Sequence, residues 1–218
     1  MNKLTFSTEK YNFASIVKNW LQVDDLTKLQ DYKTYSEDQS TNWNELFYMH
    51  VGRDEVFLET YREFLFNIVK PRYNNEEIVF QAVPTFKVHL AGSAAGGEWR
   101  KDKYYRDEVW ATRIKELNYY LPLTDTNETN TIWSESEEGK DDFSPMLLKH
   151  GECMEWDGTN LLYGSKTNKS DSTRVSVHFR VMPYSTYLPN DQCARGIGVP
   201  FKIGGYYDTS SEVMPENT

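Results

Sequence analysis

The sequence predicts a mainly β protein with N-terminal helices: a double-stranded β-helix, that is, a cupin-like jelly roll, with the helices packed on its outer sheet. Three observations predict this fold. Helical spacing of apolar residues is confined to the region before Pro71. After that point polar and apolar residues alternate in short segments that glycines separate. The 15 Tyr, 11 Phe and 6 Trp also favour strands over disorder.

Residues 1–73 are predicted to form a helical N-terminal part of a single domain that spans residues 1–218. One apolar stripe runs from about Tyr11 to Leu29 and a second ends at Pro71, which terminates its helix. Between them lies the polar stretch SEDQSTNWNE, which has no periodicity of either kind. The stripes consist of Phe13, Ile16, Val17, Trp20 and Leu21, and of Phe57, Tyr61, Phe64, Leu65 and Ile68.

Residues 76–183 are predicted to form the β-helix core, because their apolar residues recur with a period of two. In one strand Phe86, Val88 and Leu90 oppose the face that carries His89. Further strands are expected at residues 117–121, 130–134, 146–149, 153–156 and 173–182. Residues 184–208 are expected to form a packed C-terminal coil, and residues 209–218 a frayed tail.

Composition limits the classes of partner. A net charge of −9 is unfavourable for binding nucleic acid, which needs a basic surface. No apolar run reaches membrane-spanning length, and MNKLTFSTEK lacks the apolar core of a signal peptide. Cys153 and Cys193 have neither disulfide-framework nor zinc-site spacing. We therefore expect a cytoplasmic protein whose partner is a small-molecule ligand.

The predicted strand at residues 173–182 carries the clearest functional signal. Arg174 and Ser176 are two residues apart, so their side chains point to the same side of the sheet. A guanidinium binds a carboxylate through two parallel hydrogen bonds, and a hydroxyl adds another. This face is therefore predicted to bind a small carboxylate. The opposite face belongs to the core and consists of Val175, Val177, Phe179 and Val181.

Four motifs in this chain resemble the StrG-like proteins of aminoglycoside biosynthesis: GEWRKDKYYRD, ELNYYLPLTDTNETNTIWSES, WDGTNLLYGS and TRVSVHFRV. That group is similar to the non-haem Fe(II)/2-oxoglutarate oxygenases related to phytanoyl-CoA hydroxylase. The resemblance extends from about Leu26 to Asp208. It implies a double-stranded β-helix, Fe(II) held by a His-X-Asp…His triad, and 2-oxoglutarate held by an arginine. Such a triad leaves iron coordination positions open.

The family positions carry over unevenly. Arg174 falls at the arginine that binds 2-oxoglutarate, with Ser176 completing an Arg-X-Ser pattern, and Asp102 falls at the triad carboxylate. Arg100 and Tyr163 stand at the two histidine positions. A guanidinium has no lone pair to offer a metal, so Arg100 is expected to pair with Asp102 in place of the cation. Iron binding of the family type is therefore not expected.

Two alternatives for the metal centre stay open. Tyr163 either fills the space left by a metal, with its hydroxyl bonded to a neighbour, or ligates ferric iron as a phenolate, although its usual pKa near 10 favours the phenol. A displaced site is the second alternative. It would combine His89 and His178 with Asp102 or Glu116.

The ligand contacts and the function also have alternatives. Asn118 and Tyr120 share a strand face and are predicted to contact the cosubstrate, while Trp133 and Tyr104 are candidates to stack on a sugar-like substrate or to join the core. Three functions follow. The chain is an oxygenase-like enzyme acting on a small polar or sugar-like molecule, a catalytically inactive module that binds a carboxylate or sugar ligand, or a structural protein with a vestigial cleft.

Overall fold

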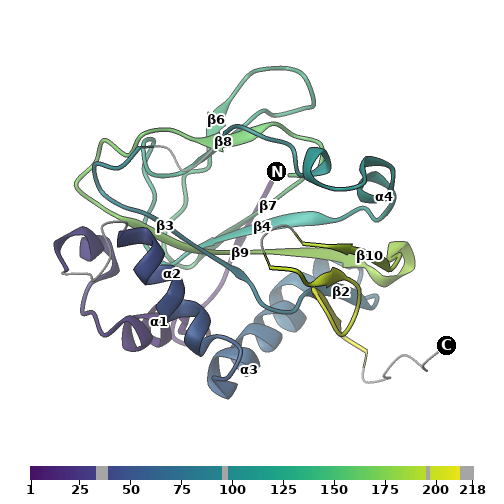
Figure 1. The fold of residues 1–218 in the computed structure, drawn as a ribbon, viewed down its shortest axis with the longest axis horizontal. Helices are drawn as coiled ribbons and strands as arrows, with labels where there is room; N and C mark the ends of the chain where they lie inside the picture. Colours follow the sequence, from purple (N-terminus) through teal and green to yellow (C-terminus); the bar gives the residue numbers. More distant parts are fainter. Residues whose placement is uncertain (33–38, 95–97, 195–196, 212–218) are drawn as a thin grey trace.

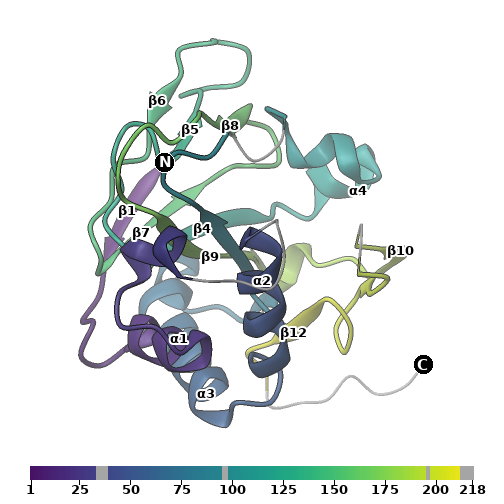
Figure 2. The same cartoon turned by 60° about the vertical axis from the view of Figure 1, so that its left-hand side comes forward.

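The computed structural model describes residues 1–32, 39–94, 98–194 and 197–211. Its elements form three layers, which Figures 1 and 2 show from two sides. Helices α1, α2 and α3 cover one face of a large antiparallel sheet, and a small sheet lies over the other face. Among the described residues, no helix has the length and apolar character needed to cross a membrane.

The predicted N-terminal helices are α1 (Phe13–Leu21) and α3 (Glu55–Phe64). Asp54 caps α3, accepting hydrogen bonds from the backbone N–H of Phe57 at 2.9 Å and from Nε1 of Trp20 at 2.7 Å. The chain continues as a π-helical turn and then a 3₁₀ turn that contains Pro71. The remaining helical elements are η1 (Leu26–Asp31), α2 (Gln39–His50), η2 (Leu65–Val69), η3 (Lys70–Tyr73), η4 (Asp102–Tyr105), α4 (Glu108–Arg113) and η5 (Tyr184–Thr186).

The seven strands of the large sheet are all paired antiparallel, and β9 lies at its centre. One edge of β9 pairs with β4, and its other edge pairs with β3 and then with β2 (Figure 1). The strand order is β1-β7-β4-β9-β2-β12, with β3 also on β9. The strands are β1 (Asn2–Thr5), β2 (Ile78–Gln81), β3 (Thr85–His89), β4 (Leu117–Pro122), β7 (Glu152–Trp156), β9 (Arg174–Pro183) and β12 (Tyr207–Thr209).

The small sheet has the order β6-β5-β8 and consists of β5 (Ile132–Ser134), β6 (Ser144–Pro145) and β8 (Tyr163–Ser165). A separate pair joins β10 (Asn190–Cys193) to β11 (Pro200–Phe201). The strand predicted at residues 146–149 is wrong. Met146 and Leu148 are buried there, but their N–H groups donate to single acceptors at Ile132 and Thr126 rather than to a strand ladder.

The predicted alternation of faces along β9 is confirmed. Val175, Val177, Phe179 and Val181 are buried in the core that the helices share with the large sheet. Another apolar cluster lies between the two sheets, beside the cavity described below, and it contains Tyr120, Ile132, Met146, Leu148, Trp156 and Tyr163. The polar face of β9 therefore points toward the small sheet, not toward the helices.

The terminal predictions need correction. Residues 2–5 are not helical but form β1, which pairs with β7. The predicted coil at 184–208 contains β10, β11 and the start of β12, and β12 adds an edge to the large sheet. Ser210, predicted to be frayed, donates its N–H to the carbonyl of Ile78 at 2.9 Å. Residues 212–218 lie outside the described part. These strands are short and lack alternation, so only their partner edges define them.

Candidate functional site

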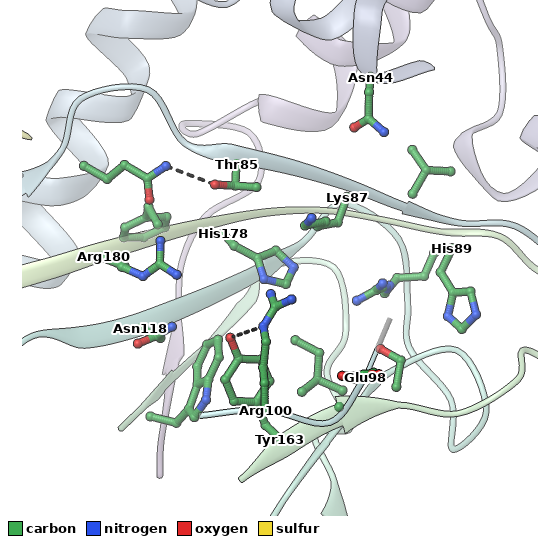
Figure 3. Close-up of a pocket in the computed structure, with 18 residues that line it drawn as sticks. Asn44, Thr85, Lys87, His89, Glu98, Arg100, Asn118, Tyr163, His178 and Arg180 are labelled. Carbon is green, nitrogen blue, oxygen red and sulfur yellow. Dashed lines mark hydrogen bonds between the residues drawn. The ribbon is translucent and has the colours of Figure 1, made fainter. Parts of the chain in front are cut away.

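A cavity of about 260 Å³ lies between the polar face of the large sheet and the small sheet. Strands β3 and β9 supply one wall, β8 supplies the other, and α2 contributes Asn44 (Figure 3). The cavity is strongly polar. Its polar and charged lining residues are Asn44, Gln81, Thr85, Lys87, His89, Glu98, Arg100, Asn118, Ser165, Arg174, His178 and Arg180.

Every second residue of β9 faces this side of the sheet: Arg174, Ser176, His178 and Arg180. The Arg174 side chain lies on the aromatic ring of Tyr120, with its central carbon 5.7 Å from the ring centre. Arg174 is only 5% exposed, yet its Nε and Nη1 atoms have no hydrogen-bond partner among the described residues. A buried guanidinium with free donors is costly unless something binds it.

Unpartnered buried atoms concentrate around this cavity. Of nine such side-chain nitrogen and oxygen atoms in the described part of the chain, six belong to residues that line it. Three are donors and three are potential acceptors. The donors are Arg174 Nε, Arg174 Nη1 and Trp156 Nε1, and the acceptors are Gln81 Oε1, Asn118 Oδ1 and, when Nδ1 carries the proton, His89 Nε2. Each unsatisfied group costs about 1–3 kcal/mol, so the pattern is typical of a binding site for a polar molecule.

The three positions that resemble the metal triad meet at one end of the cavity. Arg100 and Tyr163 form an antiparallel backbone pair, with N···O distances of 2.9 and 3.0 Å. The Tyr163 hydroxyl donates to Oδ1 of Asp102 at 2.5 Å and accepts from Nε of Arg100 at 3.2 Å. Residues that are 61 apart in the sequence are thus in direct contact.

Arg180, not Arg100, is the close cation of Asp102. Arg100 Nε is 4.0 Å from Oδ1, whereas Arg180 reaches Oδ2 from Nη2 at 2.7 Å and from Nε at 3.1 Å. Asn118 Nδ2 adds a third contact to Oδ2 at 2.9 Å. The expected Arg100–Asp102 ion pair is present at the longer distance, and Arg180 is the closer partner of Asp102. The sequence signal was the position of Arg180, six residues after Arg174 on the same face of the strand.

Asp102 is an ionised and fully engaged carboxylate. Burial opposes its ionisation, but Arg180, then Arg106, Asn118 and Tyr163, hold its pKa well below the usual range. Both of its oxygens accept hydrogen bonds from these neighbours. Each oxygen of Asp102 therefore already has at least one hydrogen-bond donor from the protein.

Glu116 is also closed off by neighbouring groups. Arg106 donates to its Oε1 at 2.6 Å, Arg180 Nε lies 3.4 Å from the same oxygen, and the Tyr207 hydroxyl donates to Oε2. Only 1% of Glu116 is exposed, and it does not line the cavity. This carboxylate therefore forms the inner end of a buried ionic network that starts at Asp102.

The donor set does not fit the iron of a His-X-Asp…His triad. Arg100 has no lone pair. Burial and the neighbouring Asp102 raise the pKa of Tyr163 well above its usual value, so it remains a phenol, which favours the space-filling alternative over ligation. The displaced site is not formed either. No group of three or more His, Cys, Asp and Glu side chains within the described ranges is arranged to hold a metal ion.

The two histidines instead belong to the cavity wall. Oγ of Ser176 lies 2.9 Å from Nε2 of His178, and Nδ1 of His89 lies 3.4 Å from the carbonyl of Asn130. Burial and the positive charge of Arg174 lower the pKa of both rings, so both are neutral near pH 7. Ser176 itself is fully buried and does not line the cavity, so its contact is to His178.

The remaining predicted ligand residues are divided. Asn118 lines the cavity, whereas Tyr120 is buried behind it, with its ring centre 5.0 Å from that of His178. Trp133 lies outside, beneath the ammonium group of Lys166, and Tyr104 is 62% exposed on the surface. Neither residue lines the cavity or a second hollow that adjoins it. That hollow, of about 560 Å³, is bounded in part by Tyr105 and by three aromatic residues that the sequence did not single out: Tyr48, Phe201 and Tyr206.

This arrangement defines a helix-covered, two-sheet β protein with a polar cavity between its sheets. Its fold is similar to that of EctD from S. alaskensis, solved with 2-oxoglutarate and 5-hydroxyectoine, at a TM-score of 0.52 and 14% identity over 91% of this chain and 73% of that one. The apo non-heme monooxygenase ThoJ gives a TM-score of 0.49 at 14% identity, covering 88% of this chain and 76% of ThoJ. No family model matches the sequence.

The full-length relative gives the family. The chain is 31% identical over 210 residues to the streptomycin biosynthesis protein StrG of Streptomyces griseus, and the match covers 95% of this chain and 97% of that protein. The protein belongs to the StrG family.

Proposed function

We propose that the cavity binds a small carboxylate, 2-oxoglutarate or a similar dicarboxylate, through Arg174, and that the protein acts on a small polar or sugar-like molecule. One observation carries the first part. A guanidinium that is 95% buried presents two unpartnered nitrogens beside a polar cavity. A buried guanidinium with unused donors is suited to a carboxylate, whose oxygens accept charge-assisted hydrogen bonds from its N–H groups.

The fold and the family support the second part. We assign the large and small sheets to a double-stranded β-helix, because they face each other across the cavity and the fold is similar to that of EctD. The family relative acts in streptomycin biosynthesis, which favours a biosynthetic role on a sugar-like compound here. The adjoining hollow, with aromatic walls at Tyr48 and Tyr105, has room for such a compound next to the carboxylate.

We assign different contacts with the ligand to different residues of the cavity. Arg174 grips the carboxylate, the unpartnered Oδ1 of Asn118 and Nε2 of His89 accept hydrogen bonds from hydroxyl groups, and Trp156 donates one. Bound Fe(II) would supply oxidation chemistry in an oxygenase. Since Arg100 and Tyr163 do not fit that ion, we assign no iron-dependent step. The binding function is therefore the core of the proposal.

Titration calorimetry with 2-oxoglutarate, succinate and citrate tests it. We expect at least one of these ligands to bind the wild type, and Arg174→Gln to reduce the affinity at least tenfold. Arg62→Gln removes an exposed arginine that pairs with Asp208 outside the cavity, and should leave the affinity unchanged. Absence of binding by all three ligands, or equal binding by both variants, would contradict the proposal. After anaerobic loading with Fe(II), formation of succinate and CO2 from 2-oxoglutarate once O2 is admitted would instead support an active oxygenase.

A further inference from the structure

The cavity has more positive charge than its own residues neutralise. Lys87 has no hydrogen-bond or ion-pair partner among the described residues, and Arg174 has two free donors. Arg100 uses only Nε, toward Tyr163, and its side chain is 39% exposed. Arg180 is different, because Asp102 and Glu116 compensate its charge. Glu98 is the one acidic side chain among the described residues that line the cavity, and it forms no ion pair with them. Lys87, Arg100 and Arg174 thus share a cavity with a single acid.

The directions of the pKa shifts in the cavity agree with a local excess of positive charge. Partial loss of hydration in the cavity lowers the pKa of Lys87, although its surface area classes it as exposed, and the charges of Arg100, Arg174 and Arg180 lower that pKa further. His178 shows the same pattern more strongly: burial first, then Arg174, Lys87 and Arg100. Charged side chains from three different segments of the chain, those of Lys87, Arg100 and Arg174, therefore affect the same cavity. A site with such a potential favours an anion of more than one charge.

The cations are distributed along the cavity rather than gathered at one point. Arg174 lies opposite His89 in the β3–β9 register, and Lys87 lies opposite Ser176, two pairs further along. Figure 3 shows the Arg100 guanidinium directed toward His178, which is four residues beyond Arg174 on β9. At about 3.3 Å per residue, the backbone positions of Arg174 and His178 are about 13 Å apart. Cations spread along the cavity in this way suit a ligand with a negative charge at each end, such as a short dicarboxylate.

We infer that the cavity binds a dianion at both ends without a metal: Arg174 holds one carboxylate, and Arg100 with Lys87 holds the second. This rests on the proposed function and extends it. Arg100 stands where the resemblance places a metal-binding histidine, so its guanidinium supplies the positive charge that a metal would supply to the second carboxylate. The ligand class is therefore a four- or five-carbon dicarboxylate or 2-oxo dicarboxylate, bound in the absence of divalent cations.

Calorimetry on metal-depleted protein in EDTA tests this, with glutarate as the dicarboxylate and butyrate as the monocarboxylate. We expect glutarate to bind at least tenfold more tightly than butyrate. Arg100→Gln and Lys87→Gln should each weaken glutarate binding at least fivefold and change butyrate binding less than twofold. Arg174→Gln should weaken both ligands. The matched controls are Arg62→Gln and Lys149→Gln, which remove exposed ion-pair cations outside the cavity.

Two results separate this inference from the proposed function. If Arg174→Gln abolishes binding while Arg100→Gln and Lys87→Gln have no selective effect on glutarate, the carboxylate site stands and the two-ended anchoring is wrong. The same conclusion follows if glutarate binds only after a divalent metal is restored. If wild-type protein binds none of 2-oxoglutarate, succinate, citrate and glutarate, with or without metal, the proposed function itself fails. Circular dichroism of each variant establishes that it is folded.

Discussion

Arg180 and Asp102 form an ion pair between the two sheets, with two guanidinium nitrogens at 2.7 and 3.1 Å from Oδ2 of the carboxylate. The pair is placed by β-sheet register. Asn118 is the cross-strand neighbour of Arg180 in the β4–β9 pairing, and both donate to the same oxygen. The central strand therefore carries an arginine with unpartnered donors, Arg174, and an arginine paired to a carboxylate, Arg180.

Breaking this pair should be strongly destabilising. Arg180→Met leaves Asp102 buried without its main cation, which costs about 3–5 kcal/mol, whereas Arg180→Met with Asp102→Leu should cost less than the sum of the single changes. Urea unfolding of the four proteins of this cycle measures the coupling. The exposed pair Lys202–Asp191 provides the matched cycle, for which we expect a coupling of about 1 kcal/mol or less. Equal coupling in both cycles would show that the buried pair has no special role.

Stability should fall as the pH drops from about 7 to 5, in part because of His178. Its pKa in the folded protein lies well below 6.5, so in this range the unfolded chain binds a proton that the folded protein does not. The free energy of unfolding therefore declines below the unfolded pKa, by at most about 1.4 kcal/mol per pH unit for this one group. His178→Gln should flatten the slope in urea titrations at pH 7, 6 and 5. An unchanged slope would mean that His178 titrates normally.

The sequence predicted those features of the site that depend on neighbouring residues, and it did not predict contacts between residues far apart in the chain. The alternation that places Arg174 opposite the apolar core is local to one strand, so it was visible in the sequence. The partner of Asp102 was not, because Arg180 is 78 residues away and only the register of the assembled sheet brings the two together. Helix α2 was missed for a related reason: its polar first turn has no stripe, and packing on neighbouring elements defines it.

The Tyr163 hydroxyl should contribute measurably to stability. It donates to an ionised, buried carboxylate and accepts from Arg100, so Tyr163→Phe leaves one side of Oδ1 of Asp102 without its donor. We expect a loss of about 1–3 kcal/mol in the free energy of urea unfolding. Tyr104→Phe makes the same change on an exposed ring and should stay within about 0.5 kcal/mol of the wild type. If the two variants are equally stable, Tyr163 only fills space.

Restoring the two histidines should restore metal binding. In Arg100→His/Tyr163→His, two neutral ring nitrogens replace groups that cannot ligate, and Oδ1 of Asp102 loses the hydroxyl that now occupies it. Arg180 and Asn118 remain on Oδ2, so Oδ1 becomes the third donor of a two-histidine, one-carboxylate set. Anaerobic Fe(II) addition followed by desalting and metal analysis should give about one equivalent in this variant and far less in the wild type.

The matched control for this restoration is Arg62→His/Tyr104→His, which adds two histidines at exposed positions and should not retain iron. A rise in the melting temperature on metal addition, confined to the first double variant, would support binding at the intended place, because a ligand that binds only the folded state stabilises it. A folded double variant that retains no metal would mean that Arg180 withdraws Asp102 from coordination even when both histidines are present. In that case Arg180→Met added to the double variant should recover the site, because it frees the carboxylate from its strongest partner.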